Sequence, residues 1–277
     1  QQPRSDTASL LDDYAGKYGF RLLETDVQSD TARPRICVNM SEDLVASELD
    51  YTPFVQLPET GLSVQPGGWR QLCVDGVQHG KRYQLTFREG LPSADGQELA
   101  KSVQISAYVR DRQPGVRFSG RAYVLPKTEG AGLPVVTVNT ETLDLAVFRV
   151  SDRNILRAVQ NGYLSWPMAE YQESGFTDDV GERLWQGTAT VTQEVNKDVT
   201  TRLPMDEALK GLAPGIYALK ASVPGVDPYA VPAAWQWFVV SDLGMTSLSG
   251  TDGLHVILRG LAGAEAKAGV TVQLLSR

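Results

Sequence analysis

The chain of 277 residues offers few side chains that could do nucleophilic, acid–base or metal chemistry, and these lie far apart. Its two histidines are His79, beside a glycine in a predicted exposed turn, and His255, inside a predicted strand. A metal site or a nucleophile–histidine pair needs partners at short spacing, and neither histidine has them. The Gly-x-Ser-x-Gly, HExxH and phosphate-loop motifs are also absent. We therefore expect no enzyme activity, no bound metal and no cofactor.

Adjacent carboxylates occur at Asp178 and Asp179, near Gly181. They could act as a general acid and base, but neighbouring carboxylates in a polar loop are common and rarely catalytic. A loop is therefore the favoured interpretation. Acidic turns at 93–96 and 251–253 favour plain turns over calcium loops, because no repeat of acidic ligands follows them.

Trp235 and Trp237 share one face of an alternating stretch that also contains Phe238. Paired tryptophans can stack on a sugar, but this run is apolar on both faces, which predicts a strand covered on both sides. We expect these three residues to be core or interface anchors. Packing roles are also predicted for three isolated tryptophans: Trp69, Trp166 and Trp185.

The elements that carry these residues are mostly strands, since apolar residues alternate between turns along most of the chain. The pattern predicts an all-β fold of tandem immunoglobulin-like antiparallel β-sandwiches with a small helical insertion. The predicted parts are an N-terminal segment with a short helix (1–22), a first sandwich (23–112), a second sandwich (113–241) with an insertion near 151–182, and the start of a third (242–277).

Three stretches decide the details of this organisation. Residues 116–125 are predicted to be one strand, and residues 155–164 a helix within the insertion. Residues 241–253 are expected to form a linker and turn between two domains, with a long hairpin inside one domain as the alternative. The third sandwich is predicted to begin with strands at 254–259 and 269–275.

Two segments, 77–83 and 212–217, share an apolar residue, a turn glycine and a tyrosine that opens a long alternating strand. This is the pattern of a tyrosine corner, in which the phenol bonds to nearby backbone. It predicts Tyr83 and Tyr217 as further anchors.

Cys37 and Cys73 each lie within a predicted strand. A disulfide between them would contribute roughly 3–4 kcal/mol on the chain-entropy estimate and would suit an oxidising compartment. Two buried free thiols are the alternative.

Charge and hydropathy exclude several classes of protein. The net charge of −7 argues against nucleic acid and acidic membrane surfaces as partners. No apolar run reaches the length of a bilayer span, and no signal-peptide pattern is present.

Several short stretches, spread in order from about residue 35 to the end, resemble the N-terminal part of bacterial alpha-2-macroglobulins. They are GKRY (80–83), GLPSADG (90–96), YVRDR (108–112), YVLP (123–126), GLPVV (132–136), RVSDRN (149–154), QWFVVSDLG (236–244) and DGLHV (252–256).

The resemblance implies macroglobulin-like β-sandwiches in a longer periplasmic protein, which in some members is held to the membrane by a lipid. Members inhibit endopeptidases: cleavage of a bait region triggers a collapse that cages the protease. Proteases are thus the expected targets of the full-length protein, and cell-wall synthases or other envelope proteins are further expected partners. Neither Cys37 nor Cys73 begins the family's Cys-x-Glu-Gln thioester motif. The resemblance implies no catalytic residue in this chain.

The chain is therefore expected to be a non-catalytic scaffold of such a protein. Two other functions stay open: an envelope adhesin or carbohydrate-binding array, and an accessory module of a cell-wall enzyme complex. Flat exposed tryptophans would favour the first, and paired carboxylates in a cleft the second.

Overall fold

A computed structural model describes residues 14, 18–45, 49–120, 122–125, 132–164 and 168–273. The chain divides into two compact units, Gln1–Arg112 and Gln113–Arg277, which we call the first and the second unit. Both are built mainly from antiparallel sheets, so the predicted all-β class with a small helical insertion is confirmed.

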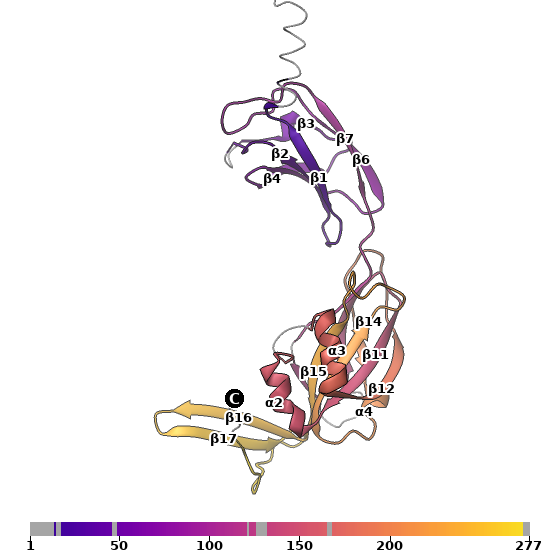
Figure 1. The fold of residues 1–277 in the computed structure, drawn as a ribbon, viewed down its shortest axis with the longest axis vertical. Coiled ribbons are helices and arrows are strands. Elements are labelled where there is room, and N and C mark those ends of the chain that lie inside the picture. The colour runs from indigo at the N-terminus through magenta and orange to yellow at the C-terminus, as the bar shows by residue number, and fades with distance from the viewer. Residues whose placement is uncertain are drawn as a thin grey trace, which may run out of the picture. The chain divides into compact units, whose positions relative to one another are not determined.

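The first unit is a sandwich of two antiparallel sheets, with strand orders β1-β2-β5-β4 and β3-β6-β7 (Figure 1). Its elements are β1 (Leu22–Gln28), β2 (Arg35–Met40), the 3-10 helix η1 (Thr52–Phe54), β3 (Val55–Gln56), β4 (Ser63–Gly68), β5 (Gln71–Asp75), β6 (Lys81–Phe87) and β7 (Val103–Val109).

The core of the first unit follows from the alternation of its strands. Along β6, Tyr83, Leu85 and Phe87 are buried while the residues between them are more exposed. These side chains pack with Ile36 and Val38 of β2 in one apolar cluster. Side chains two residues apart share a face of a strand, so the spacing dictates which face is buried.

The second unit contains a larger sandwich. Its sheets have the strand orders β13-β10-β8 and β12-β11-β14-β15-β9, and all pairs are antiparallel except β15 with β9. The strands are β8 (Gly115–Phe118), β9 (Ala122–Leu125), β10 (Gly132–Val138), β11 (Thr142–Val150), β12 (Gly181–Thr190), β13 (Val199–Pro204), β14 (Gly215–Ser222) and β15 (Ala234–Val240).

Three helices accompany these strands: α2 (Asp152–Gln160), α3 (Glu170–Asp179) and α4 (Asp206–Leu209). Figure 1 shows α2 and α3 lying against the sheet that contains β11, β14 and β15. The central strands of the five-stranded sheet, β11, β14 and β15, are therefore covered on both faces. One face packs on the three-stranded sheet, and the other packs on the two helices.

The prediction of a single strand over 116–125 is wrong. β8 pairs with β10 in one sheet, whereas β9 pairs with β15 in the other. The chain leaves the first of these sheets after Phe118, with a bend at Ser119, and enters the other sheet at Ala122. Strands that turn a corner of a sandwich in this way keep their local alternation, so the pattern alone shows no break.

Residues 243–250 are also a strand rather than a linker. β16 (Leu243–Gly250) and β17 (Gly253–Gly260) form an antiparallel hairpin around the turn at 251–252. The strand expected at 269–275 is not observed over the described residues 269–273. The remainder of that stretch lies outside the described residues.

The helical predictions are partly corrected. α2 lies at Asp152–Gln160 instead of 155–164, because Gly162 with φ 75° ends the helical path. Asp178 and Asp179 close α3 instead of lying in a loop. The short helix expected within 1–22 lies almost entirely outside the described residues, as does Trp166.

Candidate functional site

The strand β15 separates the two cores of the second unit. Phe238 points into the sandwich, where its ring stacks on Tyr217 at 5.5 Å between centroids. Trp235 and Trp237 point to the opposite face, beneath α2 and α3. They are 8% and 7% exposed, so neither indole is free to stack on a sugar.

Phe176 of α3 is the centre of the aromatic cluster on that face, and its side chain is fully buried. Its ring lies 5.3 Å from Trp235 and 5.5 Å from Trp237 between centroids, both edge-to-face. Phe148 and Tyr163 complete the cluster at 5.8 and 5.6 Å from the same ring. Edge-to-face packing adds attraction beyond the buried area, so Phe176 locks α3 onto the sheet.

Polar contacts fasten the same layer. The Trp237 indole N–H donates to the Tyr163 carbonyl at 2.9 Å, within the cluster. Glu173 of α3 forms an ion pair with Lys220 of β14, and the Lys220 ammonium lies 5.9 Å from the Trp235 ring centroid. A carboxylate and an ammonium that are both largely shielded from water interact more strongly than an exposed pair.

The two helices are also joined to each other. Asn154 of α2 donates through its amide nitrogen to the Val180 carbonyl at 3.0 Å. Arg157 of α2 pairs with Asp179 of α3 at 3.0 Å. The helical insertion is therefore held as one layer.

Sequence reasoning missed α3 and its role. Phe176 is the buried residue of this helix, and most of its remaining residues are polar. A helix with a single buried position lacks the repeat of apolar residues by which amphipathic helices are recognised. The sequence held only an indirect signal. The strand at 235–238 is predicted to be covered on both faces, which requires a further element packed on its second face.

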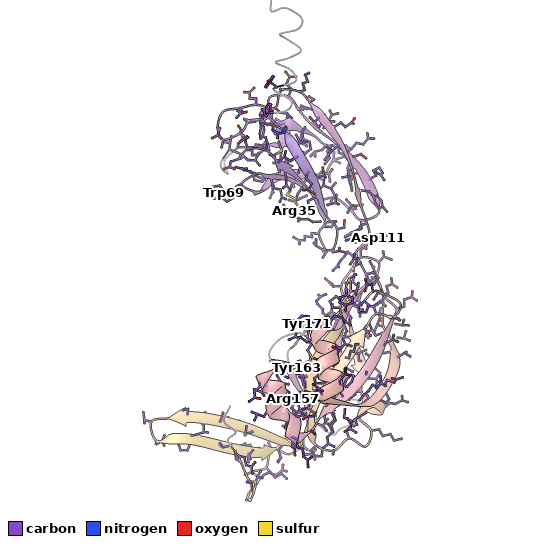
Figure 2. All side chains as sticks on the ribbon, in the orientation of Figure 1. Arg35, Trp69, Asp111, Arg157, Tyr163 and Tyr171 are labelled. Carbon is purple, nitrogen blue, oxygen red and sulfur yellow. A yellow bond between two sulfur atoms is a disulfide. The ribbon has the colours of Figure 1, made fainter. Side chains whose placement is uncertain are left out.

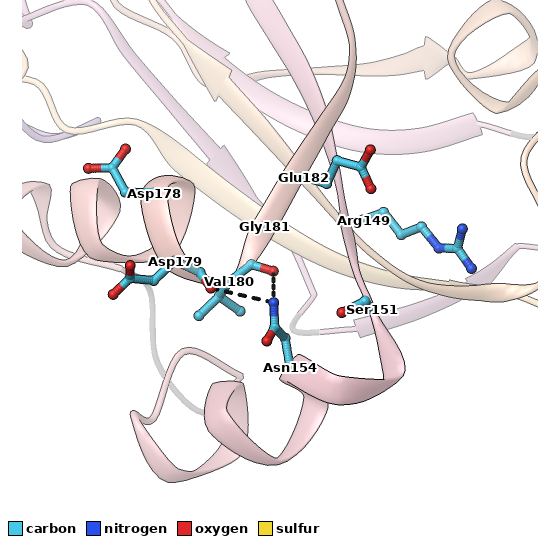
Figure 3. A pocket seen from close by; sticks show the side chains of 8 residues that line it. All are labelled: Arg149, Ser151, Asn154, Asp178, Asp179, Val180, Gly181 and Glu182. Carbon is cyan, nitrogen blue, oxygen red and sulfur yellow. Dashed lines mark hydrogen bonds between the residues drawn. The ribbon is translucent and has the colours of Figure 1, made fainter.

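A surface pocket of about 310 Å³ lies where α2, α3 and the sheet meet (Figure 3). Figure 3 shows Asp178 and Asp179 on one side of the Asn154 amide, and Arg149 with Glu182 on the other. The pocket is lined by Arg149, Ser151, Asn154, Asp178, Asp179, Val180, Gly181 and Glu182.

The lining of this pocket lacks a nucleophile–histidine pair. It holds neither histidine nor cysteine, so the Ser151 hydroxyl has no imidazole base beside it. Asp179 forms an ion pair with Arg157, and the Asn154 amide nitrogen donates hydrogen bonds to the backbone carbonyls of Asp179 and Val180. Within the described ranges, no group of three or more His, Cys, Asp or Glu side chains is placed to hold a metal ion.

Both predicted tyrosine anchors are buried and bond to backbone. The Tyr217 hydroxyl donates to the Ala213 carbonyl at 2.7 Å. The Tyr83 hydroxyl accepts the Gln78 backbone N–H at 2.9 Å. Burial raises the pKa of Tyr217 because it disfavours the phenolate, while the charge of Arg149 opposes this shift.

Cys37 and Cys73 form a disulfide between the neighbouring strands β2 and β5, where they stand directly opposite each other. Arg35 and Asp75, the opposed pair two positions along, form a two-pronged ion pair at 2.9 and 3.1 Å. The disulfide thus joins two neighbouring strands of one sheet in the first unit, and it does not link the two sheets of the sandwich.

Two predicted environments are wrong. His79 is partly buried, and its Nε2 lies 2.9 Å from the Ser29 carbonyl, so the ring donates a hydrogen bond there. Trp69 is not a packing residue: 86% of it is exposed (Figure 2). Trp185 does pack against the sandwich core of the second unit.

Comparisons with known proteins agree on one family. Residues 117–235 match the family model described as the bacterial alpha-2 macroglobulin MG2 domain. The alpha-2-macroglobulin of Xylella fastidiosa (strain Temecula1 / ATCC 700964) is 24% identical over 250 residues, covering 86% of this chain and 15% of the relative. The alpha-2-macroglobulin of Escherichia coli (strain K12) is 22% identical over 192 residues, covering 69% of this chain and 11% of the relative.

A solved structure shows the same fold. The crystal structure of Salmonella alpha-2-macroglobulin reacted with methylamine aligns with a TM-score of 0.57 and 18% identity, over 90% of this chain and 15% of that one. The present chain thus spans a small part of the length of the relatives that it matches. No helix within the described residues is long and apolar enough to cross a membrane. Residues 117–235 thus carry the MG2 domain of bacterial alpha-2 macroglobulins, and the chain as a whole is similar to bacterial alpha-2-macroglobulins.

Proposed function

We propose that this chain is a non-catalytic scaffold within a bacterial alpha-2-macroglobulin that inhibits endopeptidases by trapping them after cleavage of a bait segment elsewhere in the protein. The observation that carries the proposal is the match of residues 117–235 to the MG2 domain model. These residues form most of a sandwich with its own packed core, which is what a structural module requires.

The packing of the second unit supports a mechanical role. The central strands of its largest sheet are covered on both faces, and the helical layer is held by Phe176, by the Glu173–Lys220 ion pair and by the Asn154 amide. A close-packed interior transmits strain instead of absorbing it. Such a body suits the task of positioning later domains during a rearrangement.

The domain assignment belongs to the same proposal: a first sandwich at 23–112, a second at 113–241 and the start of a third at 242–277. The hairpin β16–β17 supports the third. Leu243, Met245 and Leu254 of this hairpin are exposed and lie on one face of it. A two-stranded hairpin is marginally stable alone, and a sandwich would cover that face.

We place the protein in the periplasm, with a lipid anchor as a property of the full-length chain. The disulfide supports this location, because disulfides persist in oxidising compartments. Proteases are the proposed targets, and cell-wall synthases or other envelope proteins are the proposed further partners.

The test uses the full-length protein and a broad-specificity endopeptidase. After incubation, protease activity is measured on a small chromogenic peptide and on a large protein substrate, with heat-denatured inhibitor as the control. A trapped protease should keep its activity on the peptide and lose most of its activity on the protein. If both activities are unchanged, the trapping function is wrong, and an adhesive or accessory role takes its place.

A further inference from the structure

Trp69 is the most exposed large apolar side chain of the described residues, with 86% of its surface in water. It stands in the two-residue turn between β4 and β5, after Gly67 and Gly68. Tryptophan is highly buried on average and is enriched at protein interfaces, where its large flat ring supplies contact area. An indole displayed on a turn is therefore a candidate contact residue.

The backbone beneath this indole is fixed. The Trp69 carbonyl accepts the Leu44 N–H at 2.7 Å, and the Arg70 carbonyl accepts the Met40 N–H at 2.7 Å. A side chain at Gly67 would meet the Cys73 sulfur at 2.4 Å, so the glycine lets the hairpin lie close over the disulfide. Because the turn is tied down at both of its residues, little backbone entropy is lost when a partner binds the ring.

Acidic residues lie close to this turn. Arg70 pairs with Asp43 through Nε at 2.6 Å. The pKa of Arg70 is raised first by the hydrogen bond and charge of Asp43, and then by the charges of Glu42 and Asp95. The Asp43 carbonyl also accepts the Ala94 N–H at 2.7 Å, which brings the turn that carries Asp95 to this place.

We define the Trp69 patch as Trp69, Arg70, Glu42, Asp43 and Asp95. Three carboxylates against one guanidinium give it a formal charge of −2. We propose that the Trp69 patch is an interaction surface for a protein segment that presents a lysine or arginine side chain. The cation would lie over the indole face while its charge is balanced by the carboxylates in excess over Arg70.

The chemistry of the patch selects this occupant. An indole face attracts a lysine or arginine cation more strongly than other aromatic rings do. The carboxylates add attraction for a cation at the same place, whereas they repel an anionic polymer. A neutral sugar would use the flat ring but would gain nothing from the net charge. The inference does not rest on protease trapping, since it concerns a surface of the first unit alone.

The experiment measures fluorescence anisotropy of three labelled probes with the full-length protein. The probes are the peptide GKGRGKG, the peptide GEGEGEG and an N-acetylglucosamine tetramer. We expect saturable binding of the basic peptide that weakens with added salt, because salt screens exposed charges, and no binding of the acidic peptide. Absence of basic-peptide binding overturns the proposal, and binding of the sugar through Trp69 replaces it with a glycan site.

Variants locate the binding. Trp69→Ala should weaken the basic peptide by about twofold to fivefold, the factor that corresponds to an exposed cation–π contact, and Trp69→Phe should restore part of the loss. Glu42→Gln with Asp95→Asn should weaken binding and reduce its salt dependence. Tyr229→Ala removes an aromatic ring that is 81% exposed in the second unit and should change nothing. Equal binding by the wild type and Trp69→Ala contradicts the proposal.

Discussion

Two buried tyrosine hydroxyls, one in each unit, are expected to make the folded chain less stable at alkaline pH. Tyr51 and Tyr217 are buried in the two units, where they donate hydrogen bonds to the carbonyls of Val45 and Ala213. Burial raises the pKa of each above its usual 10.0. A raised pKa in the folded state means that the stabilisation is complete below the unfolded pKa and is lost as pH rises through the folded pKa.

We therefore expect the free energy of unfolding in urea to be level near pH 8–9 and to fall above about pH 10. Tyr217→Phe should lower stability at pH 8 by about 1 kcal/mol, through the lost hydrogen bond. The same variant should also flatten the alkaline decline, since one titrating phenol is gone. If the free energy of unfolding of the double variant Tyr51→Phe/Tyr217→Phe fell as steeply above pH 10 as that of the wild type, the pH dependence would come from other groups.

Among the structural elements, the helix α3 depends on one side chain for its attachment. Phe176→Ala would remove a fully buried ring that contacts four aromatic neighbours. We expect the free energy of unfolding of the second unit to fall by about 3–5 kcal/mol. Urea unfolding followed by the fluorescence of the tryptophans beneath the helix measures this loss.

The matched control is Tyr171→Ala, on the same helix. Its ring is 78% exposed, so the substitution should change stability by no more than about 0.5 kcal/mol. Equal effects of the two substitutions would show that α3 is not held on the sheet by Phe176.

The pairing of β2 with β5 depends in part on the disulfide. The sequence separation of 36 residues corresponds to about 4 kcal/mol of chain-entropy stabilisation. Cys37→Ser/Cys73→Ser should therefore destabilise the first unit by up to this amount. The second unit contains no cysteine and serves as an internal control in differential scanning calorimetry. An unchanged transition for the first unit would contradict a stabilising role of the bond.

Strands with regular alternation were predictable from the sequence, and elements defined by distant contacts were not. Trp235, Trp237 and Phe238 were assigned to opposite faces because period-two alternation dictates faces. The switch of sheets after Phe118 was not visible, since alternation does not say which sheet a strand joins. The sequence predicts a packing role for Trp69, but the residue lies in a tight turn that forms only when β4 pairs with β5. That pairing could not be predicted from local alternation.

The candidate site was less predictable than the fold for a similar reason. The sequence favours a polar loop for Asp178 and Asp179, whereas the structure places both at the end of α3, across the Asn154 amide from Arg149 and Glu182. Their position at the end of α3 depends on a helix whose sequence carries one buried aromatic residue. Composition and motifs also gave no indication of the surfaces that the fold exposes, such as the turn that carries Trp69.

For the molecule as a whole, the proposed function makes these domains a stiff scaffold, while the rearrangement that follows bait cleavage occurs elsewhere in the protein. Two units with separate apolar cores are consistent with rigid bodies that move without unfolding. Amide hydrogens within such cores exchange only through large openings, whereas loops exchange through small local openings. Hydrogen exchange therefore distinguishes a scaffold from a segment that rearranges.

The most direct test is hydrogen–deuterium exchange of the full-length protein before and after reaction with an endopeptidase. We predict that amides of β6 and β7 in the first unit, and of β11, β14 and β15 in the second, keep their protection. Changes should be confined to loop residues such as 111–114, which lie between β7 and β8. Loss of protection in these central strands after cleavage would show that the domains themselves refold, and it would contradict the scaffold role.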